Sequence, residues 1–231
     1  MGRPAADHGA PERSGTSRKQ FMLLEGSPIL IHTLRKFLAC PAVHQIVVAL
    51  RAEDLDWFRE RLRAEVVSKP VDLVIGGERR QDSVKNGLAA VAAGAEWVAV
   101  HDAVRPFVSV ELIEKVIARA AQTGAAILGI PAVDTVKQVD QTLIRATLPR
   151  ERIMLAQTPQ VFRLDLLRAA YEQADGDGFA GTDEASLLEH LDRDVAVVLG
   201  SDRNIKITRP SDMALARLFL SEETAAAAAS S

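Results

Sequence analysis

The chain alternates short apolar runs with longer segments in which apolar residues recur at every third or fourth position. The short runs have the length of buried strands and lie at Gln45–Leu50, Asp72–Ile75, Trp97–Val100 and Ala125–Ile130. The longer segments predict amphipathic helices at Ile29–Leu38, Asp54–Val66, Ser83–Ala92 and Val110–Ala121. This order predicts an α/β fold with a mostly parallel sheet and right-handed crossover helices.

The alternation breaks at residues 133–161. Thr135–Val139 and Leu143–Thr147 are short, polar and joined by Asp140-Gln141-Thr142, which predicts an exposed hairpin. Because a two-stranded hairpin is marginal alone, we expect it to pack on a second subunit. The regular pattern then resumes with predicted helices at Leu164–Gln173, Asp183–His190 and Ser211–Leu220 and a strand at Val195–Leu199.

The two ends of the chain differ from the middle. Residues 1–17 are rich in Gly, Pro, Ala, Ser and charge, which predicts irregular structure. The run of alanines and serines at 221–231 has no apolar face to bury and is expected to form a loose tail. A single domain is therefore expected at 18–220, with a β-arm at about 133–161.

Composition narrows the class of protein. The 231 residues include 48% hydrophobic but only 4% aromatic residues, which suits helices and buried strands. A net charge of -3 argues against nucleic acid as a partner. The lone Cys40, expected to be buried in a helix, excludes an internal disulfide and favours a reducing compartment. No leader or membrane span is recognisable, so a cytoplasmic protein is expected.

Ligands of open α/β sheets gather at the carboxyl ends of the strands. After the second predicted strand, Gly76-Gly77 precedes a helix start that includes Asp82 and Ser83. Paired glycines allow a ligand to approach the backbone, and the first turn of a helix offers free N–H groups. An ordinary turn with Asp82 as a helix cap is the alternative, and the local sequence alone favours it.

The third predicted strand is followed by His101, Asp102 and Arg105. Asp102 is placed to hold a divalent cation such as Mg²⁺ against phosphates. An Asp102–Arg105 ion pair or a helix cap explains the acid equally well at this stage, and His101 is expected to be a packed core residue. Thr182, similarly, is interpreted as the cap of the helix that follows it.

A further cation, Lys206, lies in the apolar frame of Arg203–Pro210, which we interpret as a short strand. A charge in such a frame is costly unless it is paired, so Lys206 either forms a buried salt bridge or binds a phosphate. Lys19 and Arg150 are less informative in isolation, because exposed cations usually interact only with solvent.

Seven segments taken in order resemble the 2-C-methyl-D-erythritol 4-phosphate cytidylyltransferases over about residues 19–220. They are Lys19-Gln20-Phe21, Gly76–Val84, His101–Pro106, Asp134–Lys137, Gln157–Gln160, Thr182–Ala185 and Asn204–Pro210. The resemblance implies a Rossmann-like nucleotidyltransferase fold with a protruding β-arm that clasps a second subunit. It also implies CTP and a polyol phosphate as substrates, Mg²⁺ as cofactor, and a homodimer with shared sites.

The resemblance also implies residue roles. Lys19 would stabilise charge on the α-phosphate, and Arg13 would be the arginine of the triphosphate loop. Gly76, Gly77 and Ser83 would frame the cytosine, while Asp102 would lie near the ribose and the magnesium. The substrate phosphate would be positioned by a further set of residues: Lys206, Arg150, Arg105 and Thr135.

The N-terminus departs from the family pattern. The family opens with an apolar strand and a loop of the type Pro-Ala-Ala-Gly-x-Gly-x-Arg, whereas this chain has Pro4-Ala5-Ala6 followed by Asp7, whose carboxylate would repel triphosphate. Arg13 also stands one residue closer to Lys19 than the pattern requires. Loss of an interior strand would leave neighbouring backbone groups unpaired. This predicts either a displaced start of the sequence or a weakened protein.

Three functions therefore compete. The first is CMP transfer to methylerythritol phosphate, and the second is CMP transfer to another polyol phosphate such as ribitol 5-phosphate. The third is a catalytically impaired dimeric homologue.

Overall fold

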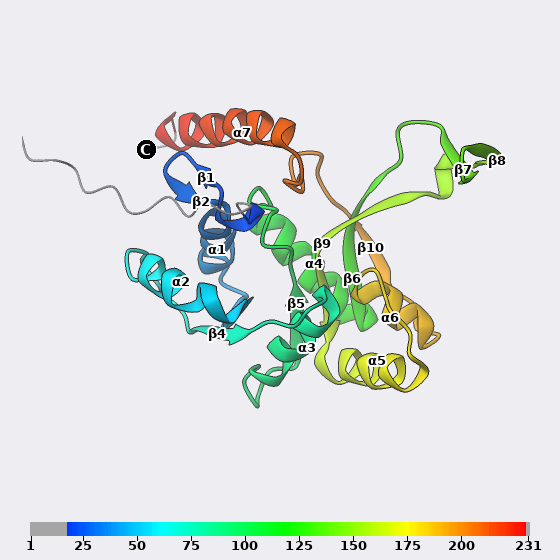
Figure 1. Ribbon diagram of the computed structural model, residues 1–231, viewed down its shortest axis with the longest axis horizontal. Coiled ribbons are helices and arrows are strands. Elements are labelled where there is room, and N and C mark those ends of the chain that lie inside the picture. The colour runs from blue at the N-terminus through cyan, green and yellow to red at the C-terminus, as the bar shows by residue number, and fades with distance from the viewer. Residues whose placement is uncertain (1–17, 230–231) are drawn as a thin grey trace, which may run out of the picture.

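The computed structural model describes residues 18–229 (Figure 1). Six strands form the central sheets: β3 (Ile46–Leu50), β4 (Val71–Ile75), β5 (Trp97–Val100), β6 (Ala125–Pro131), β9 (Met154–Arg163) and β10 (Ala196–Leu199). The helices are α1 (Ile29–Ala39), α2 (Leu55–Leu62), α3 (Arg80–Ala89), α4 (Val110–Thr123), α5 (Leu164–Asp177), α6 (Glu184–His190) and α7 (Pro210–Ala229). The predicted α/β class is confirmed.

The main sheet has the order β10-β6-β9-β5, in which β9 runs antiparallel to both of its neighbours. The parallel pair β3-β4 forms a separate sheet within residues 18–229. Residues 1–17, including Arg13 and the predicted irregular segment, lie outside the described residues.

Successive residues of β6 face two different cores. Ala125 and Ile127 belong to a cluster with α5 and α6, while Ala126 and Leu128 pack with α4. This alternation follows from the pleat of a strand, and it explains why β6 is apolar at nearly every position. The buried strands therefore hold the strand ends, where the candidate residues lie, in fixed positions.

The predicted hairpin is present as β7 (Val136–Asp140) and β8 (Leu143–Leu148), which pair only with each other and project from the body in Figure 1. The interval predicted for the arm was too long, because β9, from residue 154 onward, belongs to the main sheet. The sequence pattern did not predict β9, since Gln157 and Gln160 gave it a polar appearance although both are buried.

The predicted loose tail at 221–231 is wrong for its described part, because α7 continues to Ala229. Alanine has the highest helix propensity, so the alanine run extends the helix without needing an apolar face. Lys36 on α1 also pairs with Glu223 at 2.8 Å, which anchors this part of α7. Among residues 18–229, no helix combines the length and the apolar character needed to cross a membrane.

Other differences have local causes. Segment 203–210 is irregular rather than a strand, because its backbone N–H groups bond outside any strand ladder. Ile207 N–H donates to the Val104 carbonyl. The N–H groups of Thr208 and Arg209 donate to the Asp212 carboxylate. Helix α3 begins at Arg80, with Asp82 inside its first turn. Two smaller corrections are that α2 ends at Leu62 and that α6 is capped by Asp183 rather than Thr182.

The smaller elements complete the description. Two-residue strands β1 (Leu23–Leu24) and β2 (Ser27–Pro28) form a small hairpin before α1. Three short 3-10 helices also occur: η1 (Lys19–Phe21), η2 (Ala52–Asp54) and η3 (Arg150–Arg152). Cys40, predicted to be buried, is fully buried just after α1.

Candidate active site

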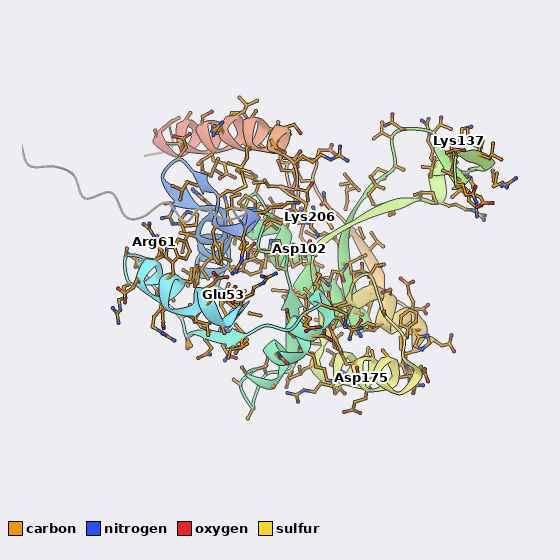
Figure 2. All side chains as sticks on the ribbon, viewed as in Figure 1. Glu53, Arg61, Asp102, Lys137, Asp175 and Lys206 are labelled. Carbon is orange, nitrogen blue, oxygen red and sulfur yellow. The ribbon has the colours of Figure 1, made fainter. Side chains whose placement is uncertain are left out.

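Asp102 follows β5 and is faced by three cations from three parts of the chain. Its Oδ2 lies 3.0 Å from Lys206 Nζ and 3.5 Å from Arg105 Nε, and its Oδ1 accepts a hydrogen bond of 3.2 Å from Arg80 Nε. Figure 2 shows Asp102 and Lys206 side by side near the centre of the molecule. The expected Asp102–Arg105 ion pair is thus present. Lys206 forms a salt bridge with Asp102, but the pair is not the buried one considered from the sequence, because the Lys206 side chain is 44% exposed.

These cations decide the charge state of Asp102. Burial alone would raise the pKa of this carboxyl group, but Lys206, Arg80 and Arg105 together outweigh burial and lower it. Asp102 is therefore ionised at neutral pH. Burial lowers the pKa of Arg105, an effect that Asp102 opposes. Arg80 also pairs with Glu184 at 2.8 Å, and the three cations still exceed these two carboxylates by one positive charge, which suits the binding of phosphates.

The Asp102 loop is held by a chain of hydrogen bonds through Thr158 of β9. The backbone N–H of Asp102 donates to Thr158 Oγ1 at 3.0 Å, and Thr158 Oγ1 lies 3.0 Å from His101 Nδ1. His101 Nε2 lies 3.0 Å from the Arg105 carbonyl oxygen. Because that carbonyl can only accept, the proton belongs on Nε2, and Thr158 then donates to Nδ1. His101 is thus a packed residue that shapes the loop, as the sequence indicated.

The unfolding free energy should depend on the pH through His101. Burial lowers the pKa of this imidazole to about 4 from 6.5, so the unfolded chain binds the extra proton first as the pH falls. Between about pH 7 and pH 5, His101 should therefore reduce the unfolding free energy by roughly 2 kcal/mol. Urea unfolding of wild type and His101→Gln should show a smaller loss in the variant. Equal losses in the two proteins would contradict this assignment.

The glycine pair and the start of α3 form the second part of the site. Gly77 N donates to Ser83 Oγ at 3.0 Å. A Cβ on Gly76 would meet Ser83 Oγ at 2.9 Å, and one on Gly77 would lie 2.2 Å from the Asp82 Cβ. Any larger residue would push the turn away from α3. The structure thus brings Gly76, Gly77 and Ser83 together, and Asp82 accepts from the Arg79 N–H at 3.2 Å as part of a capping box, as the alternative of a turn with a helix cap expects.

Arg105 and Lys206 also line a cavity of about 420 Å³ beside the loop that follows β10. Its other polar lining residues are Gln157, Asp202, Asn204, Thr208, Arg209 and Asp212, so two carboxylates stand beside its three cations. Asn204 is fully buried, and its side-chain Nδ2 donates to the Thr158 backbone carbonyl at 2.9 Å. The backbone carbonyl of Asn204 accepts a hydrogen bond of 2.7 Å from Arg105 Nη1. This cavity can receive an anion between Arg105 and Lys206.

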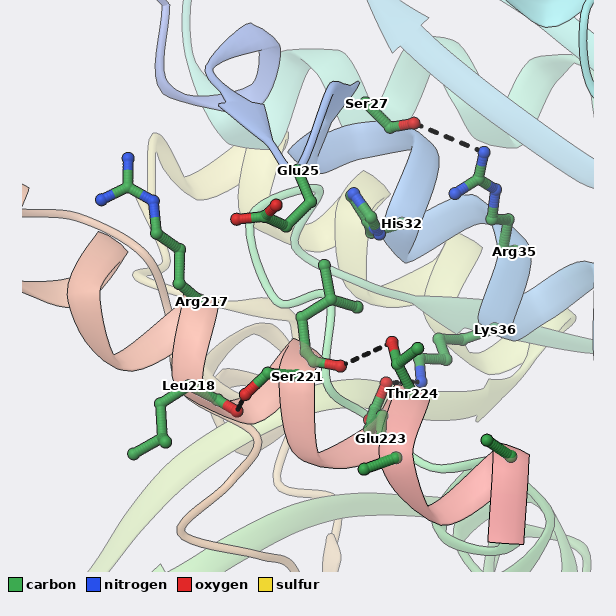
Figure 3. Close-up of a pocket in the computed structure, with 13 residues that line it drawn as sticks. Glu25, Ser27, His32, Arg35, Lys36, Arg217, Leu218, Ser221, Glu223 and Thr224 are labelled. Atoms are coloured by element: carbon green, nitrogen blue, oxygen red, sulfur yellow. Dashed lines mark hydrogen bonds and ion pairs between the residues drawn. The ribbon is translucent and has the colours of Figure 1, made fainter. Parts of the chain in front are cut away.

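A larger cavity of about 1130 Å³ lies between α1 and α7 (Figure 3). It has a mixed lining that includes His32, Arg35, Arg217 and the Lys36–Glu223 pair. Burial lowers the pKa of His32, so its ring adds no positive charge at neutral pH. None of the predicted site residues lines this cavity, and we therefore assign the candidate site to the smaller one.

Three predicted site residues stand apart from Asp102. Lys19 is exposed on η1, although the segment that follows it packs with residues flanking Lys206, since Met22 and Ile205 share one apolar cluster. Thr135 and Arg150 are exposed at the base of the hairpin, where Arg150 donates to the Val133 carbonyl at 2.7 Å. Within residues 18–229 of one chain, no hydrogen bond or ion pair joins Lys206 to Lys19, Thr135 or Arg150.

Sequence reasoning missed Arg80 and Thr158. Both residues lie in segments that carry the family resemblance, Arg80 in Gly76–Val84 and Thr158 in Gln157–Gln160, but neither was assigned a role. A polar run inside a strand-length segment next to a proline was the available signal for Thr158. No comparable signal distinguished Arg80 from Arg79, whose guanidinium instead pairs with Asp82 at 2.7 Å on the surface.

Solved structures share this fold. 4-Diphosphocytidyl-2C-methyl-D-erythritol synthase from Anaerococcus prevotii matches with a TM-score of 0.82 and 33% identity over 88% of this chain and 90% of that one. The 2-C-methyl-D-erythritol 4-phosphate cytidylyltransferase from Thermus thermophilus matches with a TM-score of 0.73 and 34% identity, covering 87% and 92%. Fold and site together define a nucleotidyltransferase with a Rossmann-like α/β architecture.

The sequence comparisons narrow this class. The model of the 2-C-methyl-D-erythritol 4-phosphate cytidylyltransferase family matches residues 3–222. The enzyme of that name from Solibacter usitatus is 59% identical over 94% of this chain and 91% of its own length, and that from Acidobacterium capsulatum is 46% identical over 96% of both. The chain belongs to the 2-C-methyl-D-erythritol 4-phosphate cytidylyltransferase family.

Proposed function

We propose that the chain transfers CMP from CTP to 2-C-methyl-D-erythritol 4-phosphate in the non-mevalonate pathway to isoprenoids. A phosphate oxygen of the polyol attacks the α-phosphorus of CTP. The bond from this phosphorus to the oxygen bridging the β-phosphate breaks, and pyrophosphate leaves with the electron pair. The observation that supports this reaction best is the cationic cluster around Asp102, because two anionic reactants must be brought together there.

The nucleotide occupies the β4–α3 side of the site in this proposal. Gly76 and Gly77 bring backbone close to the cytosine, Ser83 fixes that turn, and Asp102 faces the ribose. The hydrogen bond between Gly77 N and Ser83 Oγ supports this arrangement, because it keeps the turn against the helix start. Lys19 stabilises the charge on the α-phosphate as the leaving group departs, and Arg13 contacts the triphosphate.

The polyol phosphate occupies the cavity lined by Arg105 and Lys206. Both side chains hold positive charge that offsets repulsion between the two reactants, and fixed charges in a partly buried site act without reorganising. Thr135 and Arg150 reach the same phosphate from the hairpin of a second subunit. Their exposure at the hairpin base supports a role outside their own chain.

We further propose Mg²⁺ as the cofactor. Residues 18–229 contain no group of three His, Cys, Asp or Glu side chains that could hold a metal. Asp102 fits the ion in another way, because magnesium commonly binds one protein carboxylate together with substrate phosphates. Bound there, the ion would neutralise charge on the phosphates. A single cysteine and the use of CTP support a cytoplasmic location.

Pyrophosphate release tests the reaction. We expect turnover with CTP and methylerythritol phosphate, with ribitol 5-phosphate at least about 100-fold less efficient, because a site shaped for one polyol leaves polar groups unpaired with another. The names of the relatives do not favour ribitol 5-phosphate. Faster turnover with ribitol 5-phosphate would reject the proposed substrate. No turnover with either substrate, in a protein that still dimerises, would establish the impaired homologue.

A further inference from the structure

A second carboxylate is buried behind the nucleotide side of the site. Glu184 begins α6 and is 1% exposed. Its Oε1 accepts hydrogen bonds from Arg80 at 2.8 Å and from the Tyr171 hydroxyl at 3.1 Å. Its Oε2 is buried with no hydrogen-bond partner among residues 18–229. Burying a carboxylate is costly, and apolar replacement of such pairs is often neutral or stabilising, so stability alone does not account for it.

Arg80 connects this carboxylate to Asp102. Its Nη1 donates to Glu184, while its Nε donates to Asp102 Oδ1 at 3.2 Å. A guanidinium is planar and rigid, so holding one edge on Glu184 fixes the direction in which the other edge points. Burial alone would lower the pKa of Arg80, but Glu184 and Asp102 together raise it. Arg80 therefore remains charged between the two acids.

The start of α6 is itself held by the main sheet. Gln160 of β9, which is 1% exposed, accepts from the Ala185 N–H at 3.1 Å and donates to Asp183 at 2.7 Å. Glu184 lies between these two residues and has little freedom to move. The position of Glu184 is thus set by the strand that also carries Thr158, the residue that fixes the Asp102 backbone.

The two oxygens of Asp102 have different partners. Oδ1 faces Arg80, whereas Oδ2 faces Lys206 and Arg105, which line the phosphate cavity. A substrate phosphate can draw Lys206 away without disturbing Oδ1. The contact with Arg80 then keeps Oδ1 oriented toward the nucleotide side, while Arg105 remains beside Oδ2.

We propose that Glu184 and Arg80 form a positioning pair: Glu184 fixes the Arg80 guanidinium, and Arg80 fixes the Asp102 carboxylate for the nucleotide. This inference rests on the proposed reaction. It predicts that Arg80 acts through Asp102. Effects of two residues that act through one another are not additive, and a double-mutant cycle measures the difference.

The experiment combines Arg80→Ala and Asp102→Asn in the full chain, with turnover and CTP affinity measured. Arg80→Ala alone should lower kcat/KM for CTP by about 30-fold, with the KM for the polyol phosphate within about twofold. In the Asp102→Asn background the same change should cost at most about threefold. Glu184→Gln should lower kcat/KM for CTP by about tenfold, and Arg80→Lys should recover part of the loss.

Lys85→Ala is the matched control, since Lys85 lies on the same helix and pairs only with the exposed Asp175. It should leave kinetics unchanged, and urea unfolding identifies any variant that fails to fold. Additive losses in the cycle, or wild-type kinetics for Arg80→Ala, would overturn the positioning pair alone. If the wild type turned over neither polyol phosphate, the proposed reaction would be rejected. The same double-mutant cycle, measured as CTP binding affinity by calorimetry, would then still test whether Glu184 and Arg80 form the positioning pair. A wild type that does not bind CTP overturns both.

Discussion

Replacing Lys206 by alanine is expected to lower turnover at saturating substrates by about 100- to 1,000-fold, the range for removing one preorganised group that faces developing charge. The side chain lines the phosphate cavity and is the nearest cation to Asp102 Oδ2. The unfolding free energy should change by less than about 1 kcal/mol, because the pair is partly exposed and Asp102 keeps Arg80 and Arg105. Turnover and urea unfolding, measured on one preparation, separate the two effects.

Lys115→Ala provides the comparison for this experiment. Lys115 is an exposed lysine on α4 that pairs with Glu111 at 2.7 Å and lines neither of the two cavities. Its removal should affect neither turnover nor unfolding by more than a small amount. Equal activity of wild type and Lys206→Ala at saturating substrate would remove Lys206 from the mechanism.

If the chain forms the proposed homodimer, deleting residues 135–147 should leave monomers and lower turnover by about 100-fold or more, because misplaced phosphate-binding groups lose their effect steeply. Within residues 18–229 the hairpin pairs with no other strand, and it carries exposed apolar side chains at Val139, Leu143 and Ile144. Apolar groups on a projecting element fit a protein contact. Sedimentation velocity measures the association state, and an unchanged dimer would reject the arm assignment. Ile144→Asp in the full chain tests the same surface without a deletion.

Shared sites have a sharper signature in mixed dimers. Arg150→Ala and Lys206→Ala should each be nearly inactive when pure. If the two residues meet across the interface, a mixed dimer contains one site that lacks both residues and one site that is intact. Random exchange should then restore about one quarter of wild-type turnover. No recovery after verified subunit exchange would place Arg150 and Lys206 in the same subunit's site or exclude Arg150.

The fold was predictable where sequence pattern and burial agree. The strands at 45–50, 72–75, 97–100 and 125–130 were found within a residue or two, because each is a short and nearly continuous apolar run. β9 was missed, because the side chains of Gln157, Thr158 and Gln160 satisfy buried groups of neighbouring loops. A polar residue with this task is indistinguishable from a loop residue in a single sequence.

The site was predictable in part. Asp102, Arg105 and Lys206 were found separately, each with a structural alternative, and only the fold shows that they converge. Arg80 and Glu184 could not be identified, because their importance lies in contacts between residues more than a hundred positions apart. The places of Lys19, Thr135 and Arg150 in the site remain predictions.

β9 has a further consequence, because one strand joins the hairpin to the middle of the protein (Figure 1). It begins at Met154, just beyond the hairpin, and within a few residues reaches Thr158, whose hydroxyl accepts a hydrogen bond from the Asp102 backbone N–H. The part of β9 between the hairpin and Thr158 pairs with β6, so we expect it to move together with the main sheet. If a second subunit contacts the hairpin, as proposed, a displacement of the hairpin would reach the Asp102 carboxylate through β9, and dimer formation would be coupled to the alignment of the reactants.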